Sequence, residues 1–392
     1  MPEGRAEPPS SAVFERKCCR IAPTPYGFGV FATRPIAAGD AIMIERPLVL
    51  TPSWEVCRRA CSVCLAESQC ADGCAEWSDL CAGCGSVAFC STACAELARR
   101  EELHGHVECA GLAAWRRAVT EDDADADVAD LVVQAVRILA YRHGGTRVRP
   151  FAPELGEAEA EGEQLLRVGY EAYASRLCPM RRTARSGEGI KRAVLAALRA
   201  VPAEARVKPA ELYDVLSRHQ CNCYGVMGRG STSVGLASNV GALHYFNHSC
   251  VPNCTFDSVP LGAPAAGHRG ALWPTRFALR ALVDVAEGEE LLHCYAGSAD
   301  GPSARRAYLR DHFGFECECA RCACDDPAEE AELSERLDAM RCRCDDCGSG
   351  LGYELRRDSW AAACAGEHED EPAGRRLRCV HCGGEWECDE DD

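Results

Sequence analysis

The sequence lacks the features that would place it in or across a membrane. No stretch approaches the ~18–20 uninterrupted apolar residues of a membrane span. Residues 1–13 are rich in Pro, Ser and Glu and lack the charged-then-apolar order of a signal peptide. The sequence also lacks the dense Lys/Arg cluster that would indicate a nuclear import signal. We therefore expect a soluble protein that is not secreted, has no membrane partner and lies in the nucleus, the cytoplasm or both.

Positive charge is also scarce. Lysine and arginine total 43 against 60 aspartates and glutamates, which gives a formal net charge of −17. Because phosphate binding needs a Lys/Arg-rich face, this balance argues against direct nucleic-acid binding. Residues 325–392 alone carry 21 acidic and 8 basic residues. We interpret this acidic tail as a solubilising segment, with attraction to a basic partner or to a basic groove as the alternatives.

The abundant residue is cysteine. The chain has 392 residues, of which 47% are hydrophobic, enough for two or three domains with real cores. Its 29 cysteines come without an export signal, so reduced metal ligands are favoured over disulfides. Zinc is the leading cofactor hypothesis.

The hydrophobic pattern predicts an α+β protein. We expect residues 1–13 to be disordered, residues 26–33 to form glycine-punctuated β structure, and residues 41–45 to add a second strand that completes a β-hairpin. Short strands resume after Cys221. Apolar residues at helical spacing predict an amphipathic helix in the middle of the chain, and two further segments have helical patterns. The three predicted helices cover residues 130–141, 165–177 and 191–201.

Residues 57–110 carry a cysteine cluster with the spacing of paired zinc ligands. This segment has too little continuous apolar sequence to build a core without cross-links. A two-residue spacer lets both thiolates of a pair reach one ion at ~2.3 Å. Four ordered pairs therefore suit two tetrahedral zinc ions. The pairs are Cys61 with Cys64, Cys81 with Cys84, Cys90 with Cys94, and a histidine with Cys109.

This cluster resembles a MYND zinc finger, in which the first and third pairs share one ion and the second and fourth pairs share the other. Such fingers usually place a histidine four residues before the last cysteine, where this chain has Gly105 between His104 and His106. Either histidine can ligate, and we favour His106. Cys70 and Cys74 form an alternative knuckle or are buried thiols. The implied ligand sets are Cys61, Cys64, Cys90 and Cys94, and Cys81, Cys84, His106 and Cys109.

A second constellation joins two distant segments. Residues 247–254 read Asn-His-Ser-Cys-Val-Pro-Asn-Cys. About 70 residues later, Cys317, Cys319 and Cys322 offer three thiolates and lack a fourth. Cys250 is the natural fourth ligand, and a shared ion would fasten the later segment beside the Asn-His pair.

With these motifs in order, the chain resembles the SET-domain lysine methyltransferases of the SET and MYND family. The matching features are the glycine pair Gly27 and Gly29, the inserted finger, the Asn-His-Ser-Cys motif, the segment 288–295 that reads Gly-Glu-Glu-Leu-Leu-His-Cys-Tyr, and the later cysteine triplet. The resemblance implies the β-clip fold of small sheets, split by the finger and a helical segment and followed by a post-SET module. Together with the composition of the N-terminus and the C-terminal cysteines described below, it divides the chain into 1–13 disordered, 14–56 first SET half, 57–110 finger, 111–220 helical insert and intermediate SET segment, 221–300 core SET, 301–325 post-SET and 326–392 acidic tail with a zinc-ribbon-like module.

The resemblance also implies an activity: transfer of a methyl group from S-adenosylmethionine to a lysine of a histone or non-histone protein. Tyr295 is the implied catalytic residue. His293 lies where bulk and polarity influence how many methyl groups are added, and Phe313 replaces a tyrosine found in many relatives. The implied cofactor-binding residues are Gly27, Gly29, Asn222, Asn247, His248 and Phe315, and the implied substrate channel comprises His293, Tyr295 and Phe313.

The C-terminal region carries a third cysteine set. Cys344 and Cys347, with Cys379 and Cys382 followed by two glycines, have the form of a zinc ribbon. This segment is too small to fold on packing alone. We expect one zinc here, one at the post-SET cysteines and two in the finger, with the ribbon capping the SET domain or closing the peptide groove.

One alternative from a different class is a catalytically inactive zinc-rich adaptor. Its SET fold would not turn over, and its finger would recruit proline-rich protein partners. Saturable S-adenosylmethionine binding separates the two hypotheses, because only the enzyme needs it. In either case we expect a monomer.

Overall fold

The structure is a computed structural model, and it describes most of the chain. The described residues are 18–45, 49–68, 77, 79–100, 103–119, 126–144, 184–227, 233–238, 243–257, 277–296, 301–324, 326–340, 351–354, 375–379 and 385–388. The expected disordered N-terminus, the predicted helix over 165–177, and Cys70, Cys74, Cys344, Cys347 and Cys382 lie outside them.

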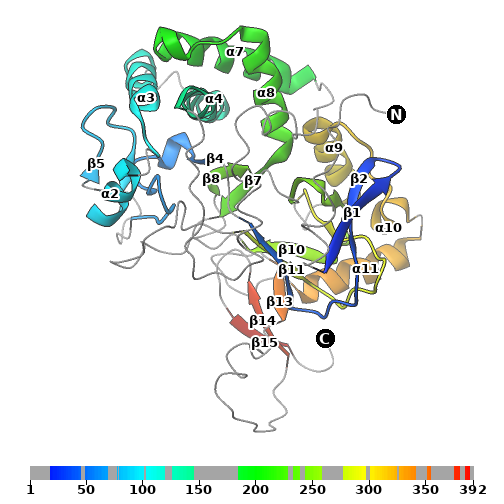
Figure 1. The fold of residues 1–392 in the computed structure, drawn as a ribbon. Helices are drawn as coiled ribbons and strands as arrows, with labels where there is room; N and C mark the ends of the chain where they lie inside the picture. Colours follow the sequence, from blue (N-terminus) through cyan, green and yellow to red (C-terminus); the bar gives the residue numbers. More distant parts are fainter. Residues whose placement is uncertain are drawn as a thin grey trace, which may run out of the picture.

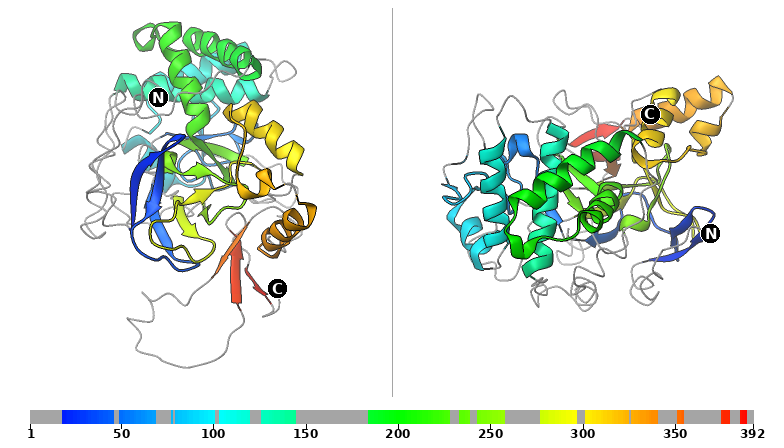
Figure 2. Two further views of the ribbon diagram at one scale, coloured as in Figure 1. Left: turned by 90° about the vertical axis from the view of Figure 1, so that its right-hand side faces the viewer. Right: turned by 90° about the horizontal axis from the view of Figure 1, so that it is seen from above.

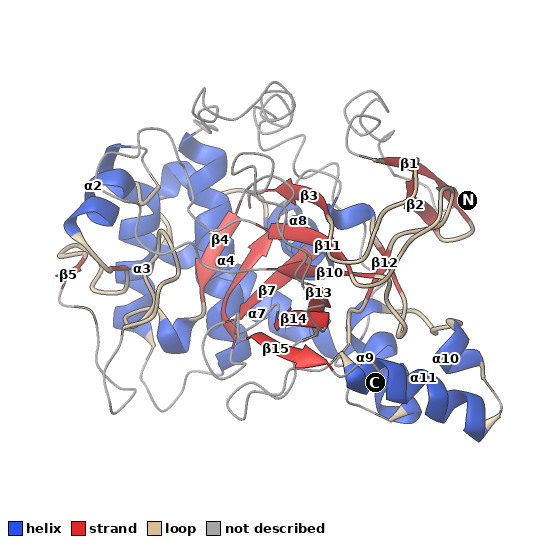
Figure 3. Cartoon of the chain, turned by 90° about the horizontal axis from the view of Figure 1, so that it is seen from below, coloured by secondary structure: helices blue, strands red, loops and turns tan. Residues whose placement is uncertain are grey.

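The described strands form small sheets rather than one continuous sheet, as the resemblance implies (Figure 3). Two three-stranded sheets lie at the centre, and the remaining sheets have two or three short strands. The central sheets are β4(Val49–Pro52)-β8(Ser233–Ser238)-β7(Cys223–Met227) and β10(Cys254–Asp257)-β11(Phe277–Ala281)-β3(Ala41–Glu45). The others are β1(Cys19–Thr24)-β2(Gly27–Ala32), β5(Asp79–Leu80)-β6(Ala88–Phe89), the parallel pair β9(Asn247–His248)-β12(Leu292–His293), and β13(Gly352–Glu354)-β14(Arg375–Cys379)-β15(Glu385–Cys388).

Each central sheet combines one strand from before the long insertion, at its edge, with two strands from after it. β4 pairs antiparallel with β8, with Leu50 opposite Ala237, and β3 pairs antiparallel with β11, with Met43 opposite Leu279. All four of these side chains are buried in one apolar cluster. The segments around β3 and β4 therefore share a core with strands that follow the long insertion, so neither half can complete this core alone.

The expected hairpin forms, but with a different partner strand. β2 pairs with β1 from Cys19 opposite Ala32 to Thr24 opposite Gly27, whereas the predicted second strand, β3, joins another sheet. The reason lies between β2 and β3. The backbones of Ile36 and Val285 exchange hydrogen bonds at 2.9 and 2.8 Å, and this pairing leads the chain away from β2 to β11.

Helices form a separate layer beside the sheets, at the top of Figure 1 and in green and cyan in Figure 2. The predicted helix over 130–141 is confirmed as the middle of α4, and the one over 191–201 falls within α7 and the residue after it. Val132, Val136 and Leu139 of α4 are each fully buried, because α4 packs against helices on several sides and against β4. The helices of this layer are α3(His106–Ala118), α4(Ala126–Gly144), α7(Ala184–Ala200) and α8(Pro209–Asn222).

The finger and the post-SET segment extend from opposite sides of this body (Figure 1). The finger carries β5, β6 and α2(Thr92–Arg100), and most of its small apolar cluster is cysteine or alanine. The other side carries α9(Pro302–Phe313), α10(Ala320–Ala323) and α11(Pro327–Ala339). None of the helices in the described parts of the chain is both long enough and apolar enough to span a membrane.

Gly235 offers a test of the pairing between β4 and β8. A Cβ at this position of β8 would overlap the backbone carbonyl oxygen of Thr51 in β4 and lie 3.1 Å from the Cα of Pro52. Backbone in a paired strand cannot yield as a flexible side chain does, so Gly235→Ala should destabilise the protein by about 2 kcal/mol. Thermal unfolding checks this. Gly301→Ala is the matched control, because nothing lies within 4 Å of a Cβ at that position; equal melting temperatures for the two variants would contradict the clash.

Candidate active site and metal centres

The four sulfurs predicted to share an ion lie together. Cys250 Sγ is 3.5 Å from Cys322 Sγ and 4.0 Å from Cys317 Sγ, and its backbone N–H donates to Cys319 Sγ at 3.4 Å. All four sulfurs fall within 4.8 Å of one another. Tetrahedral zinc with Zn–S bonds of about 2.3 Å places its sulfurs about 3.8 Å apart. The arrangement therefore fits a four-thiolate zinc site.

One thiol of this cluster differs in acidity from an ordinary buried cysteine. Hydrogen bonds from Cys250 and Cys317 lower the pKa of Cys319 well below its usual range, while hydrogen bonding within the cluster and burial raise the pKa values of Cys250 and Cys317. Cys254, only four residues after Cys250, is fully buried beside a strand carbonyl, and burial raises its pKa well above the usual value. Zinc binds the thiolate form. Cys319 is thus prepared for a metal, whereas Cys254 stays a core thiol.

The first ligand set of the finger also assembles as the resemblance implies. Cys64 Sγ and Cys90 Sγ are 3.5 Å apart, and Cys90 Sγ and Cys94 Sγ are 3.6 Å apart. Cys61 completes the four-thiol group. Hydrogen bonds from the other three thiols lower the pKa of Cys61, whereas the pKa values of Cys64 and Cys94 are raised by hydrogen bonds to Cys61. The fit to zinc therefore rests on the four sulfur donors and their spacing.

The second ligand set contains His104 and not His106, which corrects our preference. Cys81 Sγ lies 3.7 Å from Cys109 Sγ, and Cys84 Sγ lies 3.6 Å from His104 Nε2. His106 begins α3 instead, with its side chain 72% exposed and its Nε2 4.0 Å from Glu204. The two-residue spacing to Cys109 suggested His106, but the cluster combines Cys109 of the first turn of α3 with His104, which precedes the helix.

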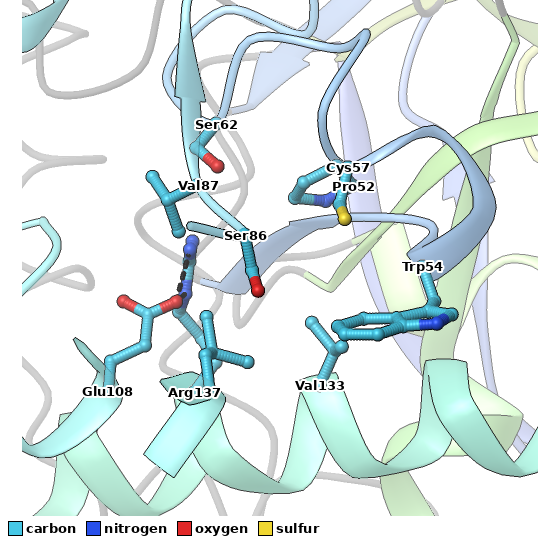
Figure 4. A pocket seen from close by; sticks show the side chains of 10 residues that line it. Pro52, Trp54, Cys57, Ser62, Ser86, Val87, Glu108, Val133 and Arg137 are labelled. Carbon is cyan, nitrogen blue, oxygen red and sulfur yellow. Dashed lines mark hydrogen bonds and ion pairs between the residues drawn. The ribbon is translucent and has the colours of Figure 1, made fainter. Parts of the chain in front are cut away.

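A buried carboxylate explains why His104 is selected. The Nδ1 atom of His104 lies 3.2 Å from Glu108 Oε2, and the Glu108 side chain is only 1% exposed. Its other oxygen accepts from Arg137 Nε at 2.6 Å, and Arg137 Nη1 donates to the Leu50 carbonyl of β4 at 2.5 Å (Figure 4). Burial opposes ionisation of Glu108, yet Arg137 and His104 hold its pKa below the ordinary value. A carboxylate on Nδ1 fixes the ring with Nε2 toward the metal.

Aromatic rings converge on Tyr295, which follows β12. Its ring centroid lies 4.6 Å from His293, 4.9 Å from Phe313, 5.2 Å from His248 and 6.4 Å from Phe315. The structure therefore brings together the predicted channel residues and two of the predicted cofactor residues. Phe313 and Phe315 flank Gly314, which has a left-handed backbone conformation and ends α9. The cluster of Cys250, Cys317, Cys319 and Cys322, called the cysteine clasp below, packs against this segment.

Two hydrogen bonds fix Tyr295 itself. Its hydroxyl donates to the Phe246 carbonyl at 2.5 Å, and its backbone N–H donates to His248 Nδ1 at 2.9 Å. Because Nδ1 accepts, the proton of a neutral His248 is on Nε2, which lies 3.2 Å from Cys250 Sγ. His248 thus connects a zinc ligand to the backbone of Tyr295.

His293 is a neutral group in this cluster. It lies opposite His248 in the parallel β9–β12 pair and is only 6% exposed. Burial lowers the pKa of His293 to about 3. Its Nε2 has no hydrogen-bond partner within the described residues. An uncharged imidazole with a free nitrogen can take part in a hydrogen bond from or to a group that enters this cluster.

The predicted glycines and Asn247 meet at the edge of the β1–β2 hairpin. Asn247 Nδ2 donates to the Phe28 carbonyl at 3.1 Å and to Glu290 Oε1 at 2.7 Å. Gly27 has φ of 124°, a conformation that favours glycine. At the tip, the Tyr26 hydroxyl donates to Glu318 at 2.9 Å and connects the hairpin to the post-SET segment.

These residues fit S-adenosylmethionine in their chemistry. Asn247 keeps an oxygen without a partner among the described residues, while its NH₂ group faces the Glu290 carboxylate, and an amide oxygen of this kind can accept from an ammonium group. Phe315 and His248, with ring centroids 5.8 Å apart, offer aromatic faces for a purine. The two four-cysteine clusters and the cluster of three cysteines with His104 fit zinc by donor type and spacing.

Two further predictions stay untested. Asn222 ends α8, is buried, and donates from its amide to the Arg218 carbonyl at 2.7 Å, a contact within the helix, so its role toward a cofactor stays a prediction. In the C-terminal module Cys379 is buried in β14, but its expected ligand partners lie beyond the described residues.

The sequence reasoning missed three residues of the site. The Tyr224 and Phe256 ring centroids lie 5.9 and 4.4 Å from that of His293, and Glu290 contacts Asn247. No motif marked Tyr224 and Phe256 for this role, because packing between different sheets places their rings beside His293. Glu290 stood inside the Gly-Glu-Glu-Leu segment, and its acidity next to a binding motif was an available signal.

Comparison with known proteins identifies the frame of this site. The family model described as the SET domain matches residues 27–296. Histone-lysine N-methyltransferase SMYD3 of Homo sapiens is 31% identical over 123 residues, which are 31% of this chain and 25% of that protein. A SET and MYND domain-containing protein of Dictyostelium discoideum is 27% identical over 124 residues, 32% of this chain and 26% of that protein.

Other similarities extend further along the chain. Histone-lysine N-methyltransferase ATXR4 of Arabidopsis thaliana is 25% identical over 308 residues, 76% of this chain and 84% of that protein. A solved structure, the SET domain of LSMT bound to lysine and AdoHcy, aligns with a TM-score of 0.36 and 14% identity over 85% of this chain and 65% of that chain. The matched region spans about a quarter of the human and Dictyostelium relatives.

The choice between the two histidines is testable by metal content. His104→Ala should lower the zinc that copurifies with the protein by one equivalent relative to wild type, because one of four ligands is lost. His106→Ala should retain the wild-type content, since that side chain is exposed. Elemental analysis of both variants and wild type measures this. Loss of zinc from His106→Ala alone would restore the original preference.

Proposed function

The chain belongs to the SET domain family, in its SET and MYND branch, and on that premise we propose that it is a protein-lysine N-methyltransferase that uses S-adenosylmethionine. When bound, this cofactor supplies an electrophilic methyl group on a sulfonium sulfur. The acceptor is a lysine side chain of a histone or another protein. The observation that carries the proposal is the convergence of rings on Tyr295, next to Asn247 and the hairpin glycines.

Tyr295 is suited to orient the attacking amine. Its hydroxyl proton is committed to the Phe246 carbonyl, so the lone pairs of its oxygen are what it offers to other groups. An amine N–H can donate to this oxygen, and that hydrogen bond would aim the nitrogen lone pair at the methyl carbon. Because the His248 hydrogen bond fixes the Tyr295 backbone, alignment is the main contribution of this residue.

The surrounding rings favour the neutral amine. A lysine with a reference pKa near 10.4 must lose a proton before its nitrogen can attack, and burial among apolar groups disfavours the ammonium form. His293, Tyr224 and Phe256 add uncharged surface on one side of Tyr295, and Phe313 adds it on another. Because its pKa is lowered, His293 stays neutral there and adds no charge near the lysine amine.

The zinc sites have a structural part in this proposal. The post-SET site would hold Phe313 and Phe315 against Tyr295, because Cys317 lies two residues after Phe315 and joins Cys250. Loss of that ion should therefore remove walls of the site without removing any reacting group.

Methyl transfer is tested with the purified protein, labelled S-adenosylmethionine and a protein extract. Wild type should label protein lysines, and Tyr295→Phe should reduce the rate by about 100-fold or more, because a positioned oxygen in the site is lost. Its affinity for S-adenosylhomocysteine should stay close to that of wild type. Absence of both labelling and saturable cofactor binding in wild type would favour the adaptor hypothesis instead.

The two phenylalanines around Gly314 should separate into two roles. Phe315→Ala should weaken S-adenosylhomocysteine binding about tenfold, since stacking on a base contributes about 1–3 kcal/mol. Phe313→Ala should change the rate or the number of methyl groups added with little change in that affinity. Calorimetric titration and product mass spectrometry measure the two effects. Equal losses of affinity in both variants would argue against separate roles.

A further inference from the structure

Glu290 lies where the two walls of the site meet. Its Oε1 accepts from Asn247 Nδ2 at 2.7 Å, and the same Nδ2 donates to the Phe28 carbonyl at 3.1 Å. A Cβ at Gly29 would overlap that carboxylate oxygen and lie 3.0 Å from Asn247 Nδ2. Glycine at position 29 thus leaves the space in which the carboxylate and the amide meet.

The backbone fixes the place of this carboxylate. Glu290 forms an antiparallel bridge with Phe31 of β2, and the next residue, Leu291, donates its N–H to the Val30 carbonyl at 2.7 Å. The bond between Glu290 and Asn247 is therefore not a chance meeting of surface side chains. It joins the hairpin, β9 and the segment before β12 at one point.

These contacts determine which way the Asn247 amide faces. A backbone carbonyl and a carboxylate can only accept hydrogen bonds, so the NH₂ group must point toward Phe28 and Glu290. The amide oxygen then points elsewhere, and it has no hydrogen-bond partner among the described residues. Without Glu290, only the Phe28 carbonyl would oppose rotation of the amide by half a turn.

Charge adds to orientation. Glu290 is partly buried, and within the described part of the chain it forms no ion pair with Lys, Arg or His. An uncompensated carboxylate on one side of the amide adds a negative potential to the acceptor oxygen on the other side, and together they attract a cation with N–H donors. The amino-acid portion of S-adenosylmethionine carries such a group, its α-ammonium.

We propose that Glu290 is a positioning residue that orients the Asn247 amide so that its oxygen receives the α-ammonium of the cofactor. This inference rests on the proposed function. Glu290 acts through Asn247 and through its own charge, and it does not touch the atoms that react.

The neighbouring glutamate provides a matched control. Glu289 also pairs with an asparagine, accepting from Asn253 Nδ2 at 3.1 Å, and its other oxygen accepts from the Ala286 N–H at 3.0 Å. It does not contact Asn247 within the described residues. Glu289→Ala therefore removes the same charge and one asparagine contact from the same segment, but it leaves the orientation of Asn247 unchanged.

The experiment compares two probes by calorimetric titration of full-length protein. S-adenosylhomocysteine has the α-ammonium, and 5′-methylthioadenosine lacks the amino-acid portion. Glu290→Ala should weaken S-adenosylhomocysteine binding about tenfold, the effect of one charge-assisted hydrogen bond. Its affinity for 5′-methylthioadenosine should not change. Glu290→Gln, which keeps an acceptor oxygen but loses the charge, should recover part of the affinity, and Glu289→Ala should match wild type.

The outcomes separate this inference from the proposed function. If wild type binds S-adenosylhomocysteine and Glu290→Ala binds it equally well, the role of Glu290 is refuted and the methyltransferase proposal stands. An equal loss for both probes, or an equal loss in Glu289→Ala, would indicate a general structural effect and would also refute it. If wild type binds neither probe, the proposed function fails and this inference fails with it. Melting temperatures of each variant show that the compared proteins are folded.

Discussion

The site depends on one clasp, in which Cys250 meets the sulfurs of Cys317, Cys319 and Cys322. Apolar packing alone gives this region little cohesion, since its small cluster has few fully buried members besides the cysteines. A metal ion bound by four thiolates can supply the missing folding free energy, as in other small cysteine-rich modules. Because Cys250 lies two residues after His248, the clasp places Phe313 and Phe315 against the residues that face Tyr295.

The same clasp reaches Tyr295 through His248. A metal-bound Cys250 is a thiolate, which accepts from the His248 Nε2–H, and this leaves Nδ1 free to accept from the Tyr295 backbone. Each step requires the one before it, since the opposite tautomer of His248 would lose both bonds. A metal with no part in the chemistry can in this way set the orientation of a residue at the proposed reaction centre.

Sequence patterns predicted the features that residue spacing determines, such as metal ligands and helices. They failed for features that depend on packing between distant segments. Ligand spacing placed eleven of the twelve cluster residues, and the missed one, His104, is chosen by Glu108 and Arg137, whose burial no spacing reveals. The hydrophobic period gave α4, but not the fact that β3 pairs with β11 instead of β2. The protein partners, the monomeric state, the cellular location and the C-terminal zinc stay predictions, because no described contact bears on them.

The buried Glu108–Arg137 pair indicates why the finger is more than an appendage. Taking two charges out of water costs several kcal/mol, and a single ion pair seldom returns more than that. Here Glu108 also contacts the zinc ligand His104, and Arg137 also donates to the Leu50 carbonyl of β4. The pair therefore spans from the finger through α4 to a central sheet, across the pocket drawn in Figure 4. Since β4 pairs with β8, these buried contacts join the finger's second ligand set to the core of the SET domain, and removing Glu108 would leave the Arg137 charge buried without its partner.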